Sequence, residues 1–227
     1  MKTRRSAATL TIMFALGAGC AQAEESYYLG VGGGRSHFRN PGECSDVGST
    51  FLNPGFSCNL DDTGNAWKVF AGYQFSKYGA SEVGYLDLGK ASLSASGTAN
   101  AFTNSLNPLV ATGTPTSIGG DFKATGWNVS LVGTLPVTEK FGLLGRIGAL
   151  WWKARLDPLV SASGVGIAGA SQSATGTKPT FGVGLKYDFA GNVGLRAEWE
   201  RFKDVGKPDT TGQTDFDLWS ASILYRF

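Results

Sequence analysis

Ser36 and His37 are the neighbouring side chains in this sequence whose types could support nucleophilic catalysis. A histidine beside a serine, with a carboxylate in reach, can activate the hydroxyl for attack on an ester. His37 is the only histidine of the chain, and the stretch RSHF around it shows no deacylase-like pattern. A single histidine at the end of a strand is more often a rim residue than a catalytic base. The sequence therefore favours a protein that is not an enzyme.

Two cysteines are the other reactive side chains to consider. Cys44 and Cys58 remain once the N-terminal leader described below is removed, and an exported pair at this spacing predicts a disulfide. In the chain-entropy model, closing so short a loop contributes about 3 kcal/mol of stability. With one histidine and no cluster of soft ligands, the sequence predicts no metal site and no cofactor.

The N-terminus has the features of a secretory signal peptide. Three basic residues precede a short apolar run over residues 10–18, and AQA at residues 21–23 has the small-x-small pattern of a cleavage site. We predict a cleaved leader over residues 1–23 and a mature domain over residues 24–227. A lipoprotein signal using Cys20 is the weaker alternative, because no large apolar residue precedes it at the expected position.

Charge and composition exclude several classes of protein. After cleavage, 17 basic residues stand against 18 acidic ones, so no basic field indicates a nucleic-acid ligand. No other segment approaches the 18 apolar residues of a spanning helix. The 33 glycines and the scarcity of helix-period stretches indicate a single all-β domain.

Period-two alternation predicts eight strands in the mature chain. Three short turns, at SKYG, PVTEK and AGN, alternate with four long connections over residues 39–64, 92–121, 156–176 and 204–213. An up-and-down meander with one short-turn side and one long-loop side produces this alternation. The predicted strands cover residues 26–38, 65–75, 80–91, 122–135, 141–155, 177–189, 192–203 and 214–227.

The apolar face of these strands decides what surrounds them. A soluble sandwich or lipocalin-like barrel would turn that face inward, and alternation alone is compatible with it. However, five tryptophans lie on the apolar face near the long-loop end, while tyrosines and phenylalanines gather near the short-turn end. Two aromatic bands around an apolar belt are typical of a transmembrane β-barrel. The five tryptophans are Trp67, Trp127, Trp151, Trp199 and Trp219.

Closure follows from backbone chemistry, because open strand edges cannot be satisfied in hydrocarbon. We therefore predict an all-β fold: an eight-stranded antiparallel up-and-down transmembrane β-barrel with four long extracellular loops and three short periplasmic turns. The inward glycines, small residues and charges predict a narrow polar interior, and an interior of eight strands is filled by side chains.

The chain resembles the OmpA-like eight-stranded outer-membrane barrels of Gram-negative bacteria. The resemblance covers the mature chain and rests on SYYLGVGGGRSHF, SEVGYLDLG, FGLLGRIGALWWKARL, VGLRAEWERF and the terminal ILYRF. It implies an outer-membrane location and a transmembrane domain without the peptidoglycan-binding domain that often follows in this family. It also implies that Tyr225 and Phe227 form the signal for the barrel-assembly machinery, with periplasmic chaperones as further partners during biogenesis.

The resemblance further implies a charged interior network that blocks or gates the lumen. Glu82 and Arg196 match an inward pair of the family. The fourth strand lacks the inward lysine of the family pattern, so a gate that exchanges partners would need Lys186 in its place, and a static plug is favoured. The implied network comprises Glu82, Arg146, Lys186, Arg196, Glu198 and Glu200.

Three functions remain in competition. The first is a structural or surface-interaction barrel, serving membrane integrity or adhesion, whose loops 39–64 and 92–121 would meet a surface ligand. The alternative is a narrow, low-conductance channel, and a lipid-modifying enzyme is the weakest. By depth, Lys153 and Arg201 would meet lipopolysaccharide phosphates just beyond the tryptophans.

Overall fold

The computed structural model describes residues 26–39, 43–106, 110–163, 165–190, 192–207, 209 and 212–227. The predicted leader, residues 1–23, lies outside this part of the chain, so its cleavage stays a prediction. Neither of the two helices in the described part, α1 (Glu43–Phe51) and α2 (Ala101–Leu106), is long and apolar enough to cross a membrane.

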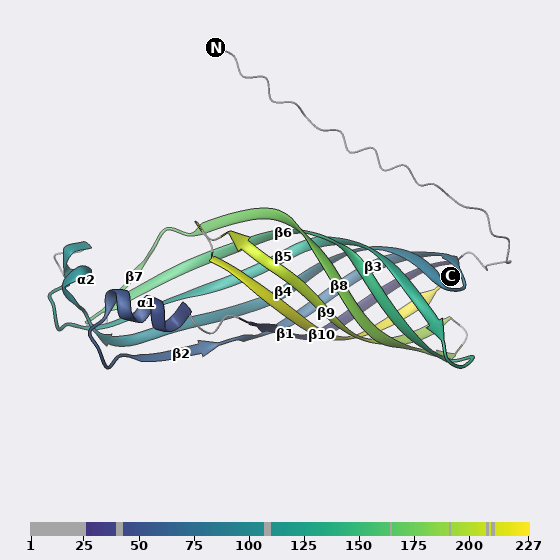
Figure 1. Ribbon diagram of the computed structural model, residues 1–227, viewed down its shortest axis with the longest axis horizontal. Helices are drawn as coiled ribbons and strands as arrows, with labels where there is room; N and C mark the ends of the chain where they lie inside the picture. Colours follow the sequence, from purple (N-terminus) through teal and green to yellow (C-terminus); the bar gives the residue numbers. More distant parts are fainter. Residues whose placement is uncertain are drawn as a thin grey trace, which may run out of the picture.

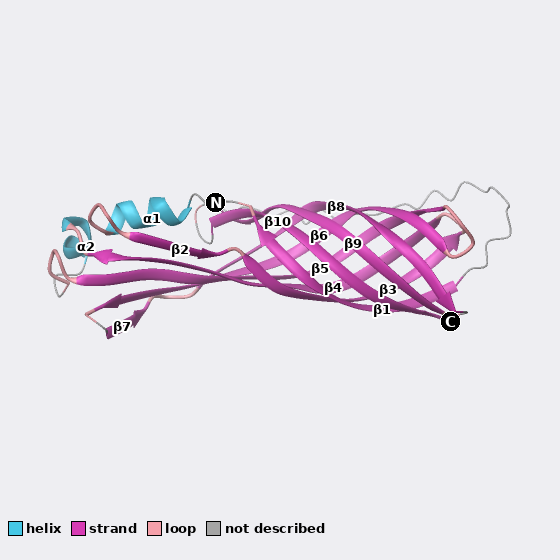
Figure 2. Ribbon diagram, turned by 90° about the horizontal axis from the view of Figure 1, so that it is seen from below, coloured by secondary structure: helices cyan, strands magenta, loops and turns pink. Residues whose placement is uncertain are grey.

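Eight strands close into an antiparallel ring in chain order (Figures 1 and 2). Each strand pairs with the next ring strand along the chain, and the first strand pairs with the last, so no edge is left open in the barrel. All eight predicted strands and the three short turns are confirmed. The ring strands are β1 (Ser26–Phe38), β3 (Thr63–Ser76), β4 (Gly79–Thr98), β5 (Pro115–Pro136), β6 (Phe141–Ala162), β8 (Gln172–Ala190), β9 (Val193–Lys207) and β10 (Gly212–Arg226).

Side chains alternate between the outside and the lumen along these strands, apart from the register shifts in four of the strand pairs. In β1, for example, Tyr27, Leu29 and Val31 are exposed, whereas Tyr28 between them is buried. The exposed residues form the apolar face that the sequence indicated, so apolar side chains point outward and the lumen takes the remainder. This arrangement suits a hydrocarbon surrounding, because every barrel strand has its backbone paired on both sides.

The long connections are more ordered than the sequence predicted, which is a correction. Residues 92–98 and 115–121 were expected in a loop, but they continue β4 and β5 in register from Ser92↔Asp121 to Thr98↔Pro115. Loop 39–64 contains α1 and the short strand β2 (Ser57–Asp61), which pairs with β4. Another short strand, β7 (Val165–Ala168), pairs with β6. Glycine, serine and threonine suggested loops by propensity, and long-range pairing overrode that preference.

The continued strands form an extension that projects well beyond the barrel, at the left of Figures 1 and 2. Leu52, Ala95 and Ile118 are buried together there, and Phe51 and Phe56 pack against them. The extension therefore has a small core of its own, separate from the barrel lumen.

Candidate functional site in the barrel lumen

Six charged side chains meet near the middle of the lumen. Their exposed fractions are only 1–6%. They come from four strands that are distant in sequence, so only barrel closure brings them together. The cluster, called the ionic layer below, comprises Lys68 of β3, Glu82 of β4, Arg146 of β6 and Arg196, Glu198 and Glu200 of β9.

Each carboxylate of the ionic layer contacts at least two cations. Lys68 Nζ lies 2.6 Å from Glu198 Oε2 and also bonds Glu200. Arg196 Nη1 donates to Glu82 Oε1 over 2.6 Å. Arg146 reaches all three carboxylates: it bonds Glu82 through Nη2, and its Nη1 lies 3.2 Å from Glu198 Oε1 and 3.0 Å from Glu200 Oε2.

Neutral hydroxyls complete the ionic layer. Tyr28 donates its hydroxyl hydrogen to Glu82 Oε1 over 2.5 Å, and Arg146 Nη2 donates to Ser130 Oγ over 3.0 Å. Three cations therefore balance three carboxylates. Balance matters here because a single uncompensated charge in a dry interior costs several kcal/mol.

Two apolar layers enclose the ionic layer. On the loop side, the largest fully buried side chains, Phe202 and Phe216, pack in one cluster with Trp152 and Leu150. On the turn side a second cluster comprises Tyr28, Phe70, Ala80, Val132, Leu144 and Leu224. The expectation of a polar interior is thus wrong over much of the lumen. The lumen is closed by apolar packing as well as by ion pairs.

Two inward glycines make room for the long side chains of the ionic layer. A Cβ added at Gly182 would lie 3.0 Å from Glu200 Cγ and 3.2 Å from Arg146 Cγ. At Gly184 it would lie 2.9 Å from Glu198 Cγ and only 2.4 Å from the carbonyl oxygen of Ala197. The two glycines of GVGLK in β8 thereby leave space for Glu198 and Glu200 of the neighbouring strand β9.

Lys186 is a correction to the predicted network. Its Nζ lies 3.3 Å from Asp188 Oδ2, near the turn end, and it makes no ion pair with the ionic layer within the described residues. Lys68 supplies the third cation instead. The alternation in WKVF indicated that Lys68 points inward on the second ring strand. The sequence did not indicate which residues of other strands would be its partners.

The predicted aromatic band surrounds the barrel at the long-loop end. Trp67, Trp127, Trp151 and Trp219 are exposed, and Trp199 is partly exposed. Trp199 and Trp219 pack together with ring centroids 6.4 Å apart. Tyr85 bridges Trp67 and Trp127, with centroid distances of 5.7 Å and 5.4 Å, and was missed at the sequence level.

The two predicted lipopolysaccharide contacts have different surroundings. Lys153 is exposed, two residues beyond Trp151, and no ion pair of it occurs among the described residues. Arg201 instead donates to both carboxylate oxygens of Asp217, over 2.7 Å and 2.9 Å, and its guanidinium lies 5.0 Å from the Trp199 ring centroid. Arg201 is therefore ion-paired within the protein, although Asp217 also accepts a hydrogen bond from Arg39 and is shared by the two arginines.

The residues that raised the question of catalysis face opposite sides of β1. Ser36 is buried and donates to the carbonyl oxygen of Leu88, whereas His37 is exposed, with Nε2 3.5 Å from Asp62 Oδ2. No hydroxyl–imidazole contact forms between them. In the described part of the chain, no group of three or more His, Cys, Asp or Glu side chains could hold a metal ion.

The structure describes the side chain of only one cysteine of the predicted disulfide. Cys58 of β2 is disulfide-bonded. The side chain of Cys44 lies outside the described part of the structure, so the Cys44–Cys58 pairing stays a prediction.

The C-terminal residues close the ring on the turn side. The backbone N–H of Phe227 donates to the carbonyl oxygen of Tyr27 over 2.9 Å. The rings of Tyr225 and Phe227 contact each other, with centroids 5.2 Å apart, and both face outward.

Comparison with known families agrees with this architecture. The model of the OmpA-like transmembrane domain matches residues 22–227. The chain belongs to that family. Outer membrane protein A of Yersinia pseudotuberculosis is 29% identical over 227 residues, which is all of this chain and 55% of that protein. Outer membrane protein A of Klebsiella pneumoniae is 26% identical and is covered over 52% of its length. The chain thus spans about half the length of these relatives.

Solved structures show the same fold for this OmpA-like chain. Ail, the attachment invasion locus protein of Yersinia pestis, superposes with a TM-score of 0.50 at 17% identity, covering 90% of this chain and 99% of Ail. Neisserial surface protein A superposes with a TM-score of 0.51 at 14% identity, covering 88% and 97%. The protein is an outer-membrane β-barrel of a Gram-negative bacterium.

Proposed function

We propose that this OmpA-like barrel is a closed structural scaffold that displays its β4–β6 extension outside the cell for contact with a surface ligand. The extension carries this proposal, because it is a folded sheet with its own core rather than a set of mobile loops. Rigid display lowers the entropy that a binding surface loses when a ligand orders it.

Side-chain hydrogen bonds support a preformed extension. Asn100 donates to the carbonyl oxygen of Thr50 over 2.9 Å, and Asn53 donates to that of Ala99 over 3.0 Å, which ties α1 to the tip of β4. Hydrogen bonds from Lys90 and from Ser92 hold the pKa of Asp121 below its usual range, so this carboxylate stays charged at neutral pH.

An anionic ligand is favoured by a row of cations at the base of the extension. Lys90, Lys123 and Arg155 are in register on three neighbouring strands, and all three are exposed. Lys90 and Arg155 pair with Asp121 and Asp157, whereas Lys123 forms no ion pair among the described residues, so the cations outnumber the carboxylates there. Ail was crystallised with sucrose octasulfate, a heparin analogue. We therefore choose heparin as the probe for this chain.

Replacing residues 92–121 with an Asn-Gly turn tests the proposal. The ring pairs up to Ala91↔Phe122 remain, so unheated and boiled samples should still migrate differently on a gel, as for a closed barrel.

The replaced segment contains no lysine or arginine. The contribution of charge is therefore tested in a second variant, Lys90→Gln with Lys123→Gln and Arg155→Gln, in which heparin binding, measured by surface plasmon resonance, should fall by about tenfold or more because several charges act together. The turn replacement should lower heparin binding as well, because it removes the surface beside these cations. Dextran is the uncharged control. Unchanged heparin binding in the folded turn replacement would refute the proposed role of the extension, and unchanged binding in the triple variant would refute an anionic ligand.

A closed lumen supports the scaffold over the channel alternative. Apolar clusters lie on both sides of the ionic layer, and eight strands leave an interior that side chains fill. The separation of Ser36 from His37 likewise disfavours a lipid-modifying enzyme. Lys153 remains our proposed contact for lipopolysaccharide phosphate, whereas Arg201 would first have to leave Asp217.

We also propose that Phe227 and Tyr225 act in assembly. Removing the ring by Phe227→Ala should leave the unfolding free energy of the refolded barrel nearly unchanged, because the ring faces lipid, while most of the protein is lost from the outer membrane of growing cells. Tyr27→Ala is the matched control, since Tyr27 is 67% exposed and Phe227 is 68% exposed. Membrane fractionation compares the two. Equal losses would show that the terminal ring carries no special signal.

A further inference from the structure

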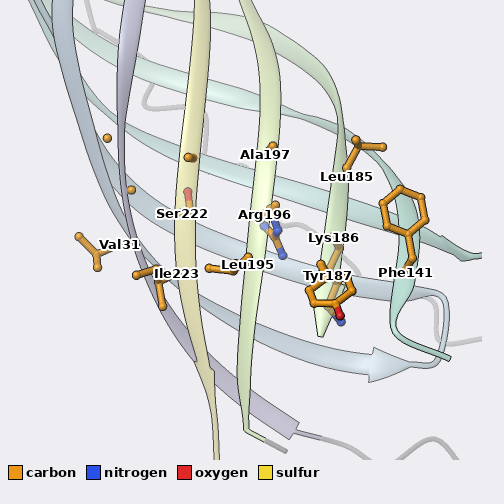
Figure 3. A pocket seen from close by; sticks show the side chains of 13 residues that line it. Val31, Phe141, Leu185, Lys186, Tyr187, Leu195, Arg196, Ala197, Ser222 and Ile223 are labelled. Atoms are coloured by element: carbon orange, nitrogen blue, oxygen red, sulfur yellow. The ribbon is translucent and has the colours of Figure 1, made fainter. Parts of the chain in front are cut away.

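A groove runs along the lipid-facing wall formed by β1, β8, β9 and β10, with the turn end of β6 at its side. It consists of two adjoining hollows of about 570 Å³ and 960 Å³. Both hollows are lined by Gly33, Leu185, Ala197 and Ala221, which lie in one register row across the four strands. Three of these four outward positions therefore carry a side chain no larger than a methyl group. Figure 3 shows the lower hollow, with Ala197 above the larger Leu195 and Ile223.

Gly33 is not required by the packing of the barrel. A Cβ added there would find its nearest neighbour, the carbonyl oxygen of Ala66, at 3.8 Å, which is an ordinary contact. At the next residue, Gly34, a Cβ would lie 1.9 Å from the carbonyl oxygen of Trp219 and could not fit. The wall therefore has room for a larger residue at position 33, and barrel packing does not require the glycine that keeps the groove open there.

Arg35 stands at the upper end of the groove. It lines the larger hollow, is exposed on the lipid-facing side, and lies in register with Trp219, at the level of the tryptophan band. Six of the seven arginines in the described part of the chain form ion pairs with a carboxylate, and Arg35 forms none. Arg35, which lacks an ion-pair partner and lies at the depth of the lipid headgroups, therefore favours binding of an anion from the membrane.

The geometry points to a bound lipid: we propose that one acyl lipid with an anionic phosphate headgroup occupies this site, with its phosphate on Arg35 and an acyl chain passing Gly33 into the groove. The Trp199–Trp219 pair flanks the chain above the small-residue row. Leu195 and Ile223 close the lower end. A lipid fits better than a second protein copy, because the apolar groove ends at an unpaired cation rather than at a self-complementary surface.

Native mass spectrometry of the refolded full chain tests this site. Phosphatidylglycerol and phosphatidylcholine of equal chain length are the probes. The unaltered protein should retain one phosphatidylglycerol with about fivefold preference, the effect of one basic residue near an anionic surface. Arg35→Gln should abolish the preference, and Gly33→Leu should weaken retention of both lipids. If Gly33→Leu does not close into a heat-modifiable barrel, the smaller change Gly33→Ala replaces it. The added Cβ would lie 3.8 Å from its nearest neighbour.

Two matched controls decide whether the effect is local. Gly133→Leu fills an exposed glycine of β5 that lines neither hollow, where a Cβ would lie 3.9 Å from its nearest neighbour, and Lys123→Gln removes an exposed cation of the same strand. Both should leave lipid retention unchanged. The proposal is overturned if either control shifts retention as much as its partner variant, or if Arg35→Gln keeps the preference. A dimer that Gly33→Leu dissociates would overturn it too, by making the groove an interface between copies.

Discussion

Glu82→Gln should lower the unfolding free energy of the barrel by about 3–5 kcal/mol, because it leaves a buried cation without its counter-charge. Glu82 accepts bonds from Arg146, Arg196 and Tyr28, so its neutralisation leaves three cations facing two carboxylates. Urea unfolding of the barrel in lipid vesicles, followed by tryptophan fluorescence, measures the change. This is one of the two largest effects that we expect from any substitution in the chain.

The second variant in this series restores the charge balance. Adding Arg196→Gln to Glu82→Gln leaves Lys68 and Arg146 opposite Glu198 and Glu200, and should recover a substantial part of the lost stability. Lys186→Gln is the control within the lumen, since its partner Asp188 lies outside the ionic layer and is about one-third exposed, and it should cost less than about 1 kcal/mol. If the double variant is no more stable than Glu82→Gln alone, charge balance is not what stabilises the layer.

Replacing Phe202 by alanine should destabilise the barrel by about 3–5 kcal/mol, and the same holds for Phe216, because each change leaves a cavity among fully buried side chains. Their rings lie in the loop-side apolar layer, so removing both would admit water as far as the ionic layer. The same vesicle experiment measures the loss of stability.

The variant with both Phe202 and Phe216 replaced by alanine also tests whether the lumen conducts ions. Planar-bilayer current should stay at the level of the bare membrane, since the ionic layer and the turn-side cluster around Phe70 and Leu144 still close the lumen. The same outcome is expected for Glu82→Gln alone, because apolar layers flank it on both sides. A steady current in either variant would favour the channel alternative over a closed scaffold.

The position of the ionic layer explains why a polar lumen need not conduct. Charges that face an open aqueous path would be screened by water, whereas these six are enclosed by aromatic rings and aliphatic side chains. Ion pairs of this kind add little to net stability over well-packed apolar residues. We infer that their contribution is to the register of β3, β4, β6 and β9, since a shift of one residue would turn every partner to the lipid side.

Local sequence determined the parts of this protein that depend on alternation and on chain order. The eight strands, the outward apolar face, the tryptophan band and the three short turns follow from period-two patterns, which a strand expresses without reference to its partners. The inward direction of Glu82, Arg146, Arg196, Glu198 and Glu200 follows in the same way. These features need only the knowledge of which residues are apolar.

Tertiary structure alone decided which inward residues meet. Lys68 rather than Lys186 completes the ionic layer because pairing register sets the depth of each side chain in the barrel, and closure of the ring brings Lys68 to Glu198, which is 130 residues away in the sequence. Likewise, Arg201 forms an ion pair with Asp217 on the neighbouring strand. The serine-rich segments expected as loops form the extension because they pair with other segments of the chain. Hydrogen bonding and packing between remote segments carry energies that no local pattern encodes, which is why these contacts could not be predicted from the sequence.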